Sequence, residues 1–167
     1  VEMVTAEQRG RAKTINFATL YGQGAFALAQ QLGIPRDEAK EVIAAYFERF
    51  SGVRCFLDEQ VASARELGYV ETLLGRRRYI PELQGSNGNI RQFGERIAQN
   101  TPIQGTAADL LKKAMIEVDR ALEGSSWGAR LLLTVHDELL FEVPEERVDE
   151  VRPVVVGLME GAVELSV

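Results

Sequence analysis

Residues 9–24 read RGRAKTINFATLYGQG, and the interpretation of the whole chain starts from this stretch. The pattern T-x-x-Q that begins at Thr5 is a capping box, in which a hydroxyl and an amide each satisfy a free backbone N–H at a helix start. A helix is therefore expected over residues 5–20. We expect Gly22 and Gly24 to end it, because glycine adopts positive φ angles at little cost.

Side chains of two kinds recur at every fourth position of this helix and form one slowly winding stripe: Arg9, Lys13, Phe17 and Tyr21. The cations come first and the aromatic rings follow. Such a stripe could hold a triphosphate at its cationic end and stack a base or a sugar at its aromatic end. On spacing alone, the more common explanation is a surface helix whose aromatic residues contact the core.

The rest of the sequence predicts a helix-rich α+β fold, because helical patterns dominate and two hairpins interrupt them. We expect Pro102 to kink or divide the longest helix, since proline lacks an N–H. The expected elements are helices over residues 25–32, 35–50, 52–67 and 90–122, hairpins over 69–80 and 131–143, and a last helix opened by Pro144.

A short polar turn, His136-Asp137-Glu138, separates the two apolar strands of the second hairpin. Adjacent carboxylates repel each other unless solvent or a cation lies between them, and carboxylate oxygens suit Mg²⁺. Asp137 and Glu138 are therefore candidate metal ligands. The alternative is that acidic residues are simply common in turns. His136, taken alone, is more often a structural hydrogen-bonding residue than a ligand.

Polar side chains at spacing four also mark the long helix, where Arg96, Asn100 and Gln104 share one face. A cation and two amides could bond the minor-groove acceptors that every base pair offers, which would give sequence-independent recognition. A helix face that caps the break at Pro102 explains them equally well. The three consecutive arginines at residues 76–78 indicate either a phosphate contact or a solvated hairpin edge.

Composition and charge exclude several classes of protein. The chain has 167 residues, of which 46% are hydrophobic and 26% charged, as in folded globular proteins. One cysteine and one histidine exclude an internal disulfide and Cys2His2 zinc sites. No apolar run approaches the roughly 18 residues of a membrane span. The net charge is −6, but residues 137–167 carry −7, which leaves +1 for the remainder and room for local basic stripes.

Taken together, four stretches resemble the motifs of family A DNA polymerases, and they occur in the order of that family. RGRAKTINFATLYGQG is similar to the helix of the fingers subdomain, and LGYVETLLGRRRYIPEL to the following hairpin. ERIAQNTPIQGTAADLLKKAM resembles the long helix of the palm, and TVHDELLFEV its second carboxylate motif. The resemblance covers essentially the whole chain.

The resemblance implies a role for each residue of the stripe. Arg9 and Lys13 match the residues that hold the triphosphate of the incoming nucleotide, and Lys13 also matches the donor of a proton to the departing pyrophosphate. Phe17 matches the residue packed on the sugar and base. Tyr21 matches the residue that occupies the templating position before closure, and Gly22 lets the helix end beside the template.

The resemblance also implies contacts to DNA and to metal from the second half of the chain. Asp137 matches a catalytic metal ligand, and Glu138 lies beside it with a lesser role. The residues that match contacts to the primer terminus and its duplex are Arg96, Asn100, Gln104 and His136.

The implied reaction is DNA-templated DNA synthesis, in which a primer 3′-hydroxyl attacks the α-phosphate of a dNTP and pyrophosphate leaves. Two Mg²⁺ ions would assist it. The family's first carboxylate motif, which supplies an Asp that bridges both metals, is absent from this sequence. We therefore expect the chain to be a segment of a longer protein, truncated at both ends and inactive when isolated.

The resemblance divides the chain into fingers helices at 1–68, a hairpin and loop at 69–88, and palm at 89–167. It implies primer–template DNA and dNTP as partners, no membrane, a monomeric full-length protein and a nucleoid-associated location in a bacterial cytoplasm. The alternative is a non-catalytic nucleic-acid-binding module that kept the family's surface. Loss of Lys13 or Asp137 would mark such a module, and both residues are present.

Overall fold

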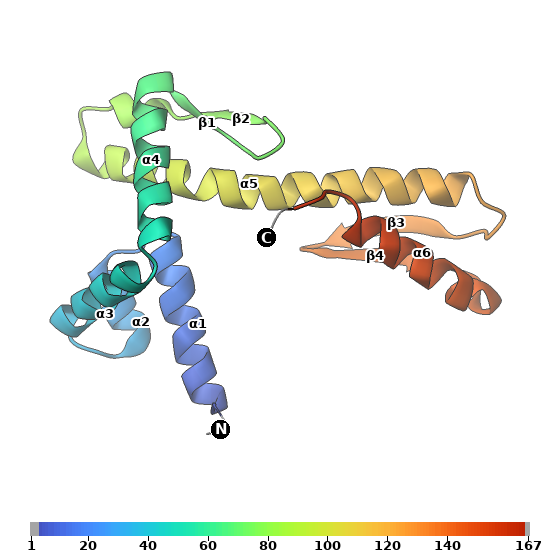
Figure 1. Cartoon of the computed structure of the whole chain (residues 1–167), viewed down its shortest axis with the longest axis horizontal. Helices are drawn as coiled ribbons and strands as arrows, with labels where there is room; N and C mark the ends of the chain where they lie inside the picture. Colours follow the sequence, from blue (N-terminus) through green and yellow to red (C-terminus); the bar gives the residue numbers. More distant parts are fainter. Residues whose placement is uncertain (1–3, 166–167) are drawn as a thin grey trace. The chain divides into compact units, whose positions relative to one another are not determined.

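The computed structural model describes residues 4–165 and divides into two compact units, Val1–Ile103 and Gln104–Val167. Each unit combines helices with a two-stranded antiparallel sheet, so the predicted helix-rich α+β class is confirmed (Figure 1). The division falls inside the longest helix, which contributes to both units. Each unit is therefore described by itself.

The first helix, α1 (Ala6–Leu20), begins at the predicted capping box. The Gln8 backbone N–H donates to the Thr5 hydroxyl at 3.1 Å, and the Thr5 N–H donates to Gln8 Oε1 at 2.8 Å. Gly22 adopts the expected positive φ of 71°. The same expectation for Gly24 was wrong, because Gly24 has φ −76° and serves as the N-cap of the next helix.

A small apolar core joins α1 to α2 (Ala25–Leu32) and α3 (Arg36–Arg49), which lie beside it (Figure 1). Ala18 of α1, Leu28 of α2 and Ala39 of α3 are 3%, 0% and 0% exposed. Complete burial of one leucine contributes about 1.5–3 kcal/mol. The other buried residues of this core are alanines, and larger side chains pack around them at its edge: Ile15, Leu32, Ile34, Val42 and Ile43.

The next helix, α4 (Ser51–Leu67), ends at Gly68, whose φ of 79° is typical of a helix C-cap. The chain then forms the predicted hairpin from β1 (Tyr69–Glu71) and β2 (Arg77–Tyr79), with Gly75 at φ 80° in the connection. A short 3-10 helix, η1 (Pro81–Gln84), follows. These elements share a second core with α5, formed by Ala64, Val70, Ile80, Leu83, Ile97 and Ala98.

The longest helix, α5 (Gly88–Glu123), runs without a break through Pro102. The expectation that proline would divide it was therefore wrong. Pro102 deprives only the carbonyl of Ala98 of its usual donor, and the helical turns on both sides retain their own hydrogen bonds. The free-energy cost of one missing backbone hydrogen bond is small compared with the stabilisation from the rest of this long helix.

In the second unit, β3 (Arg130–Val135) pairs antiparallel with β4 (Glu138–Glu142). The last residue of β3 pairs with the first residue of β4, so the turn consists of His136 and Asp137 alone. The pairing shifts register around Leu132, which marks a β-bulge in β3. The predicted hairpin is confirmed, with a turn shorter by one residue than the polar stretch indicated.

The hairpin packs on α5 and on α6 (Val148–Glu160) through a third core. Pro144 does not open that helix as expected, because it adopts an extended conformation and a 3-10 turn, η2 (Glu145–Arg147), comes first. The buried residues of this core are Val118, Leu122, Ala129, Val151 and Val155.

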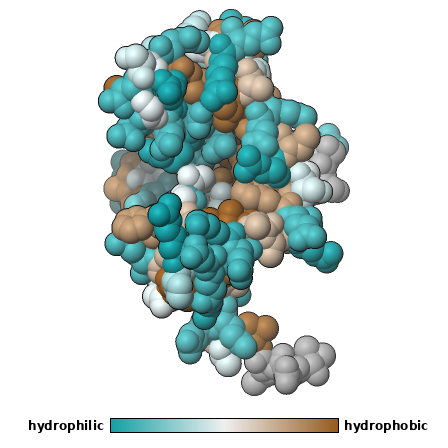
Figure 2. Space-filling view, turned by 90° about the vertical axis from the view of Figure 1, so that its left-hand side faces the viewer, coloured by the Kyte–Doolittle hydropathy of each residue, from teal (hydrophilic) through white to brown (hydrophobic). Residues whose placement is uncertain are grey.

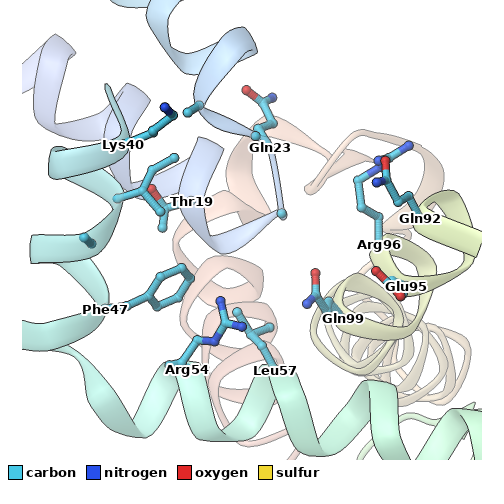
Figure 3. A pocket seen from close by; sticks show the side chains of 15 residues that line it. Thr19, Gln23, Lys40, Phe47, Arg54, Leu57, Gln92, Glu95, Arg96 and Gln99 are labelled. Carbon is cyan, nitrogen blue, oxygen red and sulfur yellow. The ribbon is translucent and has the colours of Figure 1, made fainter. Parts of the chain in front are cut away.

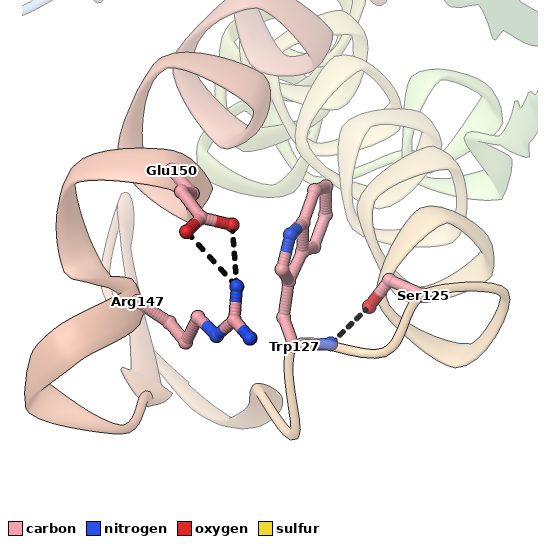
Figure 4. A network of polar contacts seen from close by, with 4 residues as sticks. All are labelled: Ser125, Trp127, Arg147 and Glu150. Carbon is pink, nitrogen blue, oxygen red and sulfur yellow. Dashed lines mark hydrogen bonds and ion pairs between the residues drawn. The ribbon is translucent and has the colours of Figure 1, made fainter.

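The loop between α5 and β3 is fastened by local hydrogen bonds (Figure 4). The Ser125 hydroxyl donates to the carbonyl of Leu122 at 2.8 Å and accepts from the Trp127 N–H at 3.3 Å. Close by, Arg147 Nη1 lies 2.9 Å from both carboxylate oxygens of Glu150. The two Ser125 bonds hold the loop that leads into β3, whereas the Arg147–Glu150 pair is local to the start of α6.

Hydrophilic side chains cover most of the face drawn in Figure 2, with smaller hydrophobic groups between them. Across residues 4–165, no helix combines the length and the apolar content that a membrane span requires.

Candidate functional site

The predicted stripe lies on the exposed side of α1, and we call Arg9, Lys13, Phe17 and Tyr21 the α1 ridge. Lys13 Nζ lies 5.7 Å from the centroid of the Phe17 ring, which stacks on the Tyr21 ring at 5.7 Å with an angle of 23° between the planes. One ammonium group and two rings thus form a continuous column along the helix.

The ridge does not belong to the core. Phe17 is 41% exposed, whereas Ala18 and Thr19 are 3% and 2% exposed. The helix therefore packs mainly through these smaller residues, while Phe17 is partly exposed and Tyr21 is half-buried. Among residues 4–165, neither Arg9 nor Lys13 has a carboxylate within ion-pair distance. Both cations are consequently available to an anionic ligand.

At the end of α1 the chain approaches α5 closely. A Cβ atom on Gly22 would lie 2.7 Å from Gln99 Oε1 and 3.3 Å from Arg96 Cγ. Glycine is favoured at this contact because its φ is positive, and a larger residue would also force the Gln99 side chain to move. The structure thus brings together Gly22 and Arg96, two of the residues predicted to contact DNA.

A pocket of about 800 Å³ opens beside this contact, within the first unit (Figure 3). Its walls carry three cations, Lys40, Arg54 and Arg96, against one carboxylate, Glu95. Its other polar lining includes amides and hydroxyls from α1 and α5. The residues drawn with labels are Thr19, Gln23, Lys40, Phe47, Arg54, Leu57, Gln92, Glu95, Arg96 and Gln99.

The charged groups of the pocket differ in how far they are neutralised. Lys40 and Arg54 each lie 2.7 Å from an aspartate of their own helix, and Glu95 lies 2.5 Å from Arg65. Arg96 has no carboxylate partner in the described part of the chain and lies 5.9 Å from the centroid of the Phe93 ring. Its guanidinium is thus the lining cation best able to meet an anion.

Two buried polar atoms of the pocket lining lack a hydrogen-bond partner, Thr19 Oγ1 and Gln23 Oε1. A buried oxygen without a partner costs about 1–3 kcal/mol, so these atoms favour a ligand or water that supplies one. Sequence reasoning missed this pocket. Its walls come from helices separated by tens of residues, and only the paired glycines at the end of α1 hint at a close approach.

Further along α5, Asn100 continues the face that carries Arg96. Asn100 Oδ1 is also buried without a partner. Gln104, the first residue of the second unit, follows at the same spacing and is exposed. The three side chains therefore recur on one helix as predicted.

The acidic hairpin tip belongs to the second unit. His136, Asp137 and Glu138 are all exposed, and His136 has φ 57°, a left-handed conformation that is uncommon for residues other than glycine, although histidine adopts it more often than most. Asp137 lies in the turn itself, while Glu138 begins β4.

Beside this tip lies a second pocket of about 470 Å³ with a mostly apolar lining. His136, Asp137 and Glu160 are its polar residues, and the remaining lining comes from α5, from Met159 of α6 and from the segment 162–165 that follows this helix. Within residues 4–165, no group of three or more His, Cys, Asp or Glu side chains could hold a metal ion.

Comparison with known proteins identifies the class. The family model for DNA polymerase family A matches residues 1–167. The chain belongs to DNA polymerase family A.

Its relatives include DNA polymerase I of Streptococcus pneumoniae serotype 4, 50% identical over 164 residues, and that of Bacillus subtilis, 49% identical over 164 residues. Each alignment covers 98% of this chain and 19% of the relative, so the chain spans about a fifth of their length. A solved structure, the POL domain of Pol1 from M. smegmatis in complex with DNA primer-template and dNTP, is 49% identical with a TM-score of 0.93. The match covers 98% of this chain and 29% of that one.

Proposed function

We propose that this chain supplies the nucleotide-binding helix and part of the metal site of a DNA-templated DNA polymerase. The observation that carries the proposal is the α1 ridge, with unpaired cations ahead of a stacked pair of rings. Membership of DNA polymerase family A supports it. The substrates are a dNTP and a primer–template. The whole protein acts as a monomer on DNA in a bacterial cytoplasm.

Arg9 and Lys13 bind the triphosphate of the incoming nucleotide. A guanidinium can engage two phosphate oxygens at once, and an ammonium acts as a point charge that can also give up a proton. Phe17 packs against the sugar and base through its exposed ring, which already lies beside Lys13. This order of side chains matches the order of triphosphate, sugar and base in a nucleotide.

The template strand passes the end of α1, beside Tyr21 and Gly22. The adjoining pocket suits an unpaired template nucleotide because Arg96 offers a cation without a carboxylate partner and Thr19 and Gln23 offer unpartnered oxygens. The Arg96 guanidinium would bind a phosphate of the template, and the Thr19 hydroxyl and Gln23 amide would form hydrogen bonds with a base edge.

Arg96, Asn100, Gln104 and His136 contact the primer end and the duplex behind it. Amide and guanidinium groups can bond the acceptors that all base pairs share in the minor groove, so the contact does not depend on sequence. A replicative or repair enzyme needs contacts of this kind, because it must accept any template.

Asp137 holds Mg²⁺, with Glu138 beside it in a lesser role. The exposed carboxylate in a tight turn offers oxygen ligands of the kind that a hard cation prefers. The remaining ligands would come from a part of the whole protein outside this sequence. When bound, the ions lower the pKa of the primer hydroxyl and neutralise charge on the phosphates.

The reaction forms a bond between the primer 3′-oxygen and the α-phosphorus, and breaks the bond from that phosphorus to the oxygen of the leaving pyrophosphate. Lys13 donates its proton to this leaving oxygen, and Arg9 stabilises the charge that develops on the β- and γ-phosphates. The proton of the primer hydroxyl passes to solvent. Closure of α1 over a correct base pair brings both cations to the nucleotide.

The test is single-turnover nucleotide incorporation by the whole protein with Lys13→Ala. Loss of a proton donor and phosphate ligand is expected to slow incorporation about 10²- to 10⁴-fold while primer–template affinity changes less than about threefold. Lys113→Ala, which removes an exposed lysine of α5, serves as the matched control. An equal loss of turnover and of DNA affinity in Lys13→Ala would refute the assignment.

A further inference from the structure

A polar contact joins the flank of α1 to α3 within the first unit. The Tyr46 hydroxyl donates to Asn16 Oδ1 at 2.8 Å, although the two residues are 30 positions apart in the sequence. A second contact joins the same helices, between Arg11 Nη2 and Glu38 Oε1 at 3.6 Å. That ion pair is about half exposed at both ends, so it restrains α1 only weakly.

The Tyr46 ring is held in place by other rings. Its centroid lies 5.5 Å from that of Phe47, in an edge-on arrangement, and 5.0 Å from that of Phe50, at the junction of α3 and α4. Tyr46 itself is half-buried. A side chain fixed in this way loses little further entropy when its hydroxyl forms a bond, so the contact to Asn16 is well defined in direction.

The core beneath α1 contains few large side chains that are fully buried. Three of its four buried residues, Ala18, Ala29 and Ala39, are alanines, Leu28 is the fourth, and partly buried hydrophobic residues such as Ile15 and Val42 surround them. Helices settle into fixed orientations because large side chains of one fill the grooves of the other, and alanine provides only shallow ridges. The directional hydrogen bond from Tyr46 to Asn16 at the flank of α1 adds a further restraint on the rotation of this helix.

Asn16 occupies the place on α1 where such a bond has most effect. It directly precedes Phe17 and follows Lys13 by three residues, which is less than one helical turn. A small rotation of α1 about its axis would therefore move the Lys13 ammonium and the Phe17 ring together. Catalytic groups need to be held to within about 0.5 Å and 10–20° of their productive position.

We infer that Tyr46 is a positioning residue for nucleotide incorporation, which acts through Asn16 to fix the rotational setting of α1 and hence of Lys13 and Phe17. Tyr46 does not itself touch the nucleotide. The inference rests on the proposed function, because it assigns Tyr46 a part in the same reaction.

The experiment measures single-turnover incorporation by the whole protein with Tyr46→Phe, Asn16→Leu and both changes together. Each single variant is expected to lower the rate at saturating nucleotide about three- to tenfold, because one net hydrogen bond is lost. The double variant should be no slower than the slower single variant, since both changes break the same bond. Primer–template Kd should stay within about twofold of the parent value in each case.

Tyr79→Phe is the matched control, because it removes a hydroxyl from a tyrosine that is 69% exposed on β2. Its rate should equal that of the unchanged protein. Tyr46→Phe with an unchanged rate, fully additive losses in the double variant, or a loss confined to primer–template affinity would each overturn the inference. Absence of extension by the unchanged protein would overturn the proposed function, and the inference with it.

Discussion

Phe17 is the residue whose identity makes the sharpest chemical prediction. The proposed site packs its bare ring against the nucleotide sugar, so no hydroxyl from the protein can stand in for a missing 3′-hydroxyl. Phe17→Tyr adds one at this place and should ease incorporation of dideoxynucleotides at least about tenfold relative to dNTPs. Competition between the two nucleotides in primer extension by the whole protein measures it.

Phe56→Tyr makes the same chemical change on α4, away from the α1 ridge, and should leave the preference unaltered. Unchanged discrimination in Phe17→Tyr would count against the placement of the sugar on Phe17.

Cys55 offers a second prediction at the scale of the single residue. Its thiol donates to Glu59 Oε1 at 3.1 Å, and this bond, together with the charge of Glu59, raises the pKa of the exposed thiol. Because only the thiolate is alkylated, the raised pKa slows the reaction at neutral pH. Glu59→Gln should therefore increase the rate of iodoacetamide labelling and shift its pH profile to lower pH.

The matched change Glu66→Gln, elsewhere on α4, should have no such effect on Cys55. Equal labelling rates for Glu59→Gln and the parent protein across the pH range would show that the contact does not govern the thiol.

At the scale of the element, the end of α1 can be tested through a pair of glycines. Gly22 and Gly33 both end helices with positive φ, at 71° and 66°, but only Gly22 is crowded by neighbouring atoms. Gly33→Ala should cost about 1–2 kcal/mol of unfolding free energy, from backbone strain alone. Gly22→Ala should cost about 0.5–1.5 kcal/mol more, because its Cβ would force the flexible end of the Gln99 side chain to move and would crowd Arg96 Cγ.

Denaturant unfolding of the whole protein with each single substitution measures the difference. Equal costs for Gly22→Ala and Gly33→Ala would show that α1 does not rest on α5 as closely as the structure indicates.

Local signals were enough to predict most elements from the sequence. The capping box at Thr5, glycine at the end of α4 and the patterned hairpins all act within a few residues, so the sequence contains them directly. The predictions for Gly24 and Pro102 were wrong because each relied on the usual local effect of one residue type, which its surroundings overrode. Gly24 caps the start of a helix instead of ending one, and α5 absorbs Pro102 because its length outweighs one lost bond.

Features that depend on contacts distant in sequence could not be predicted. The bond from Tyr46 to Asn16 and the cationic pocket both join separate helices, and no periodicity within one helix reveals them. The left-handed conformation of His136 was not predicted either, because histidine adopts it more often than most residues but still only in a minority of cases. By contrast, the α1 ridge could be predicted because Arg9, Lys13 and Phe17 lie on one helix and Tyr21 is its C-cap, so their spacing of four residues places them on one side.

At the scale of the whole molecule, the chain spans about a fifth of the length of its relatives, and the family's first carboxylate motif is absent from its sequence. We therefore expect the isolated 167-residue chain to show no primer extension with Mg²⁺. A gel assay with labelled primer tests this, with the whole protein as the positive control. Robust extension by pure isolated chain would show that the chain holds a complete metal site.

The alternative function, a non-catalytic nucleic-acid-binding module, makes a different prediction for the whole protein. It would bind primer–template but neither extend it nor respond to dNTP. Titration of dNTP into the complex separates the two functions, because a polymerase should bind the complementary nucleotide more tightly than the other three. Equal binding of all four would favour the module.

The proposal that the α1 ridge binds the incoming nucleotide and Asp137 binds Mg²⁺ is tested most directly by a structure of the whole protein with primer–template, Mg²⁺ and a non-hydrolysable dNTP. We expect Arg9 and Lys13 within hydrogen-bond distance of the triphosphate, Phe17 against the sugar, and Asp137 bound to a metal at the α-phosphate of that nucleotide. A nucleotide paired with the template while the α1 ridge and Asp137 remain free of it would refute the proposal.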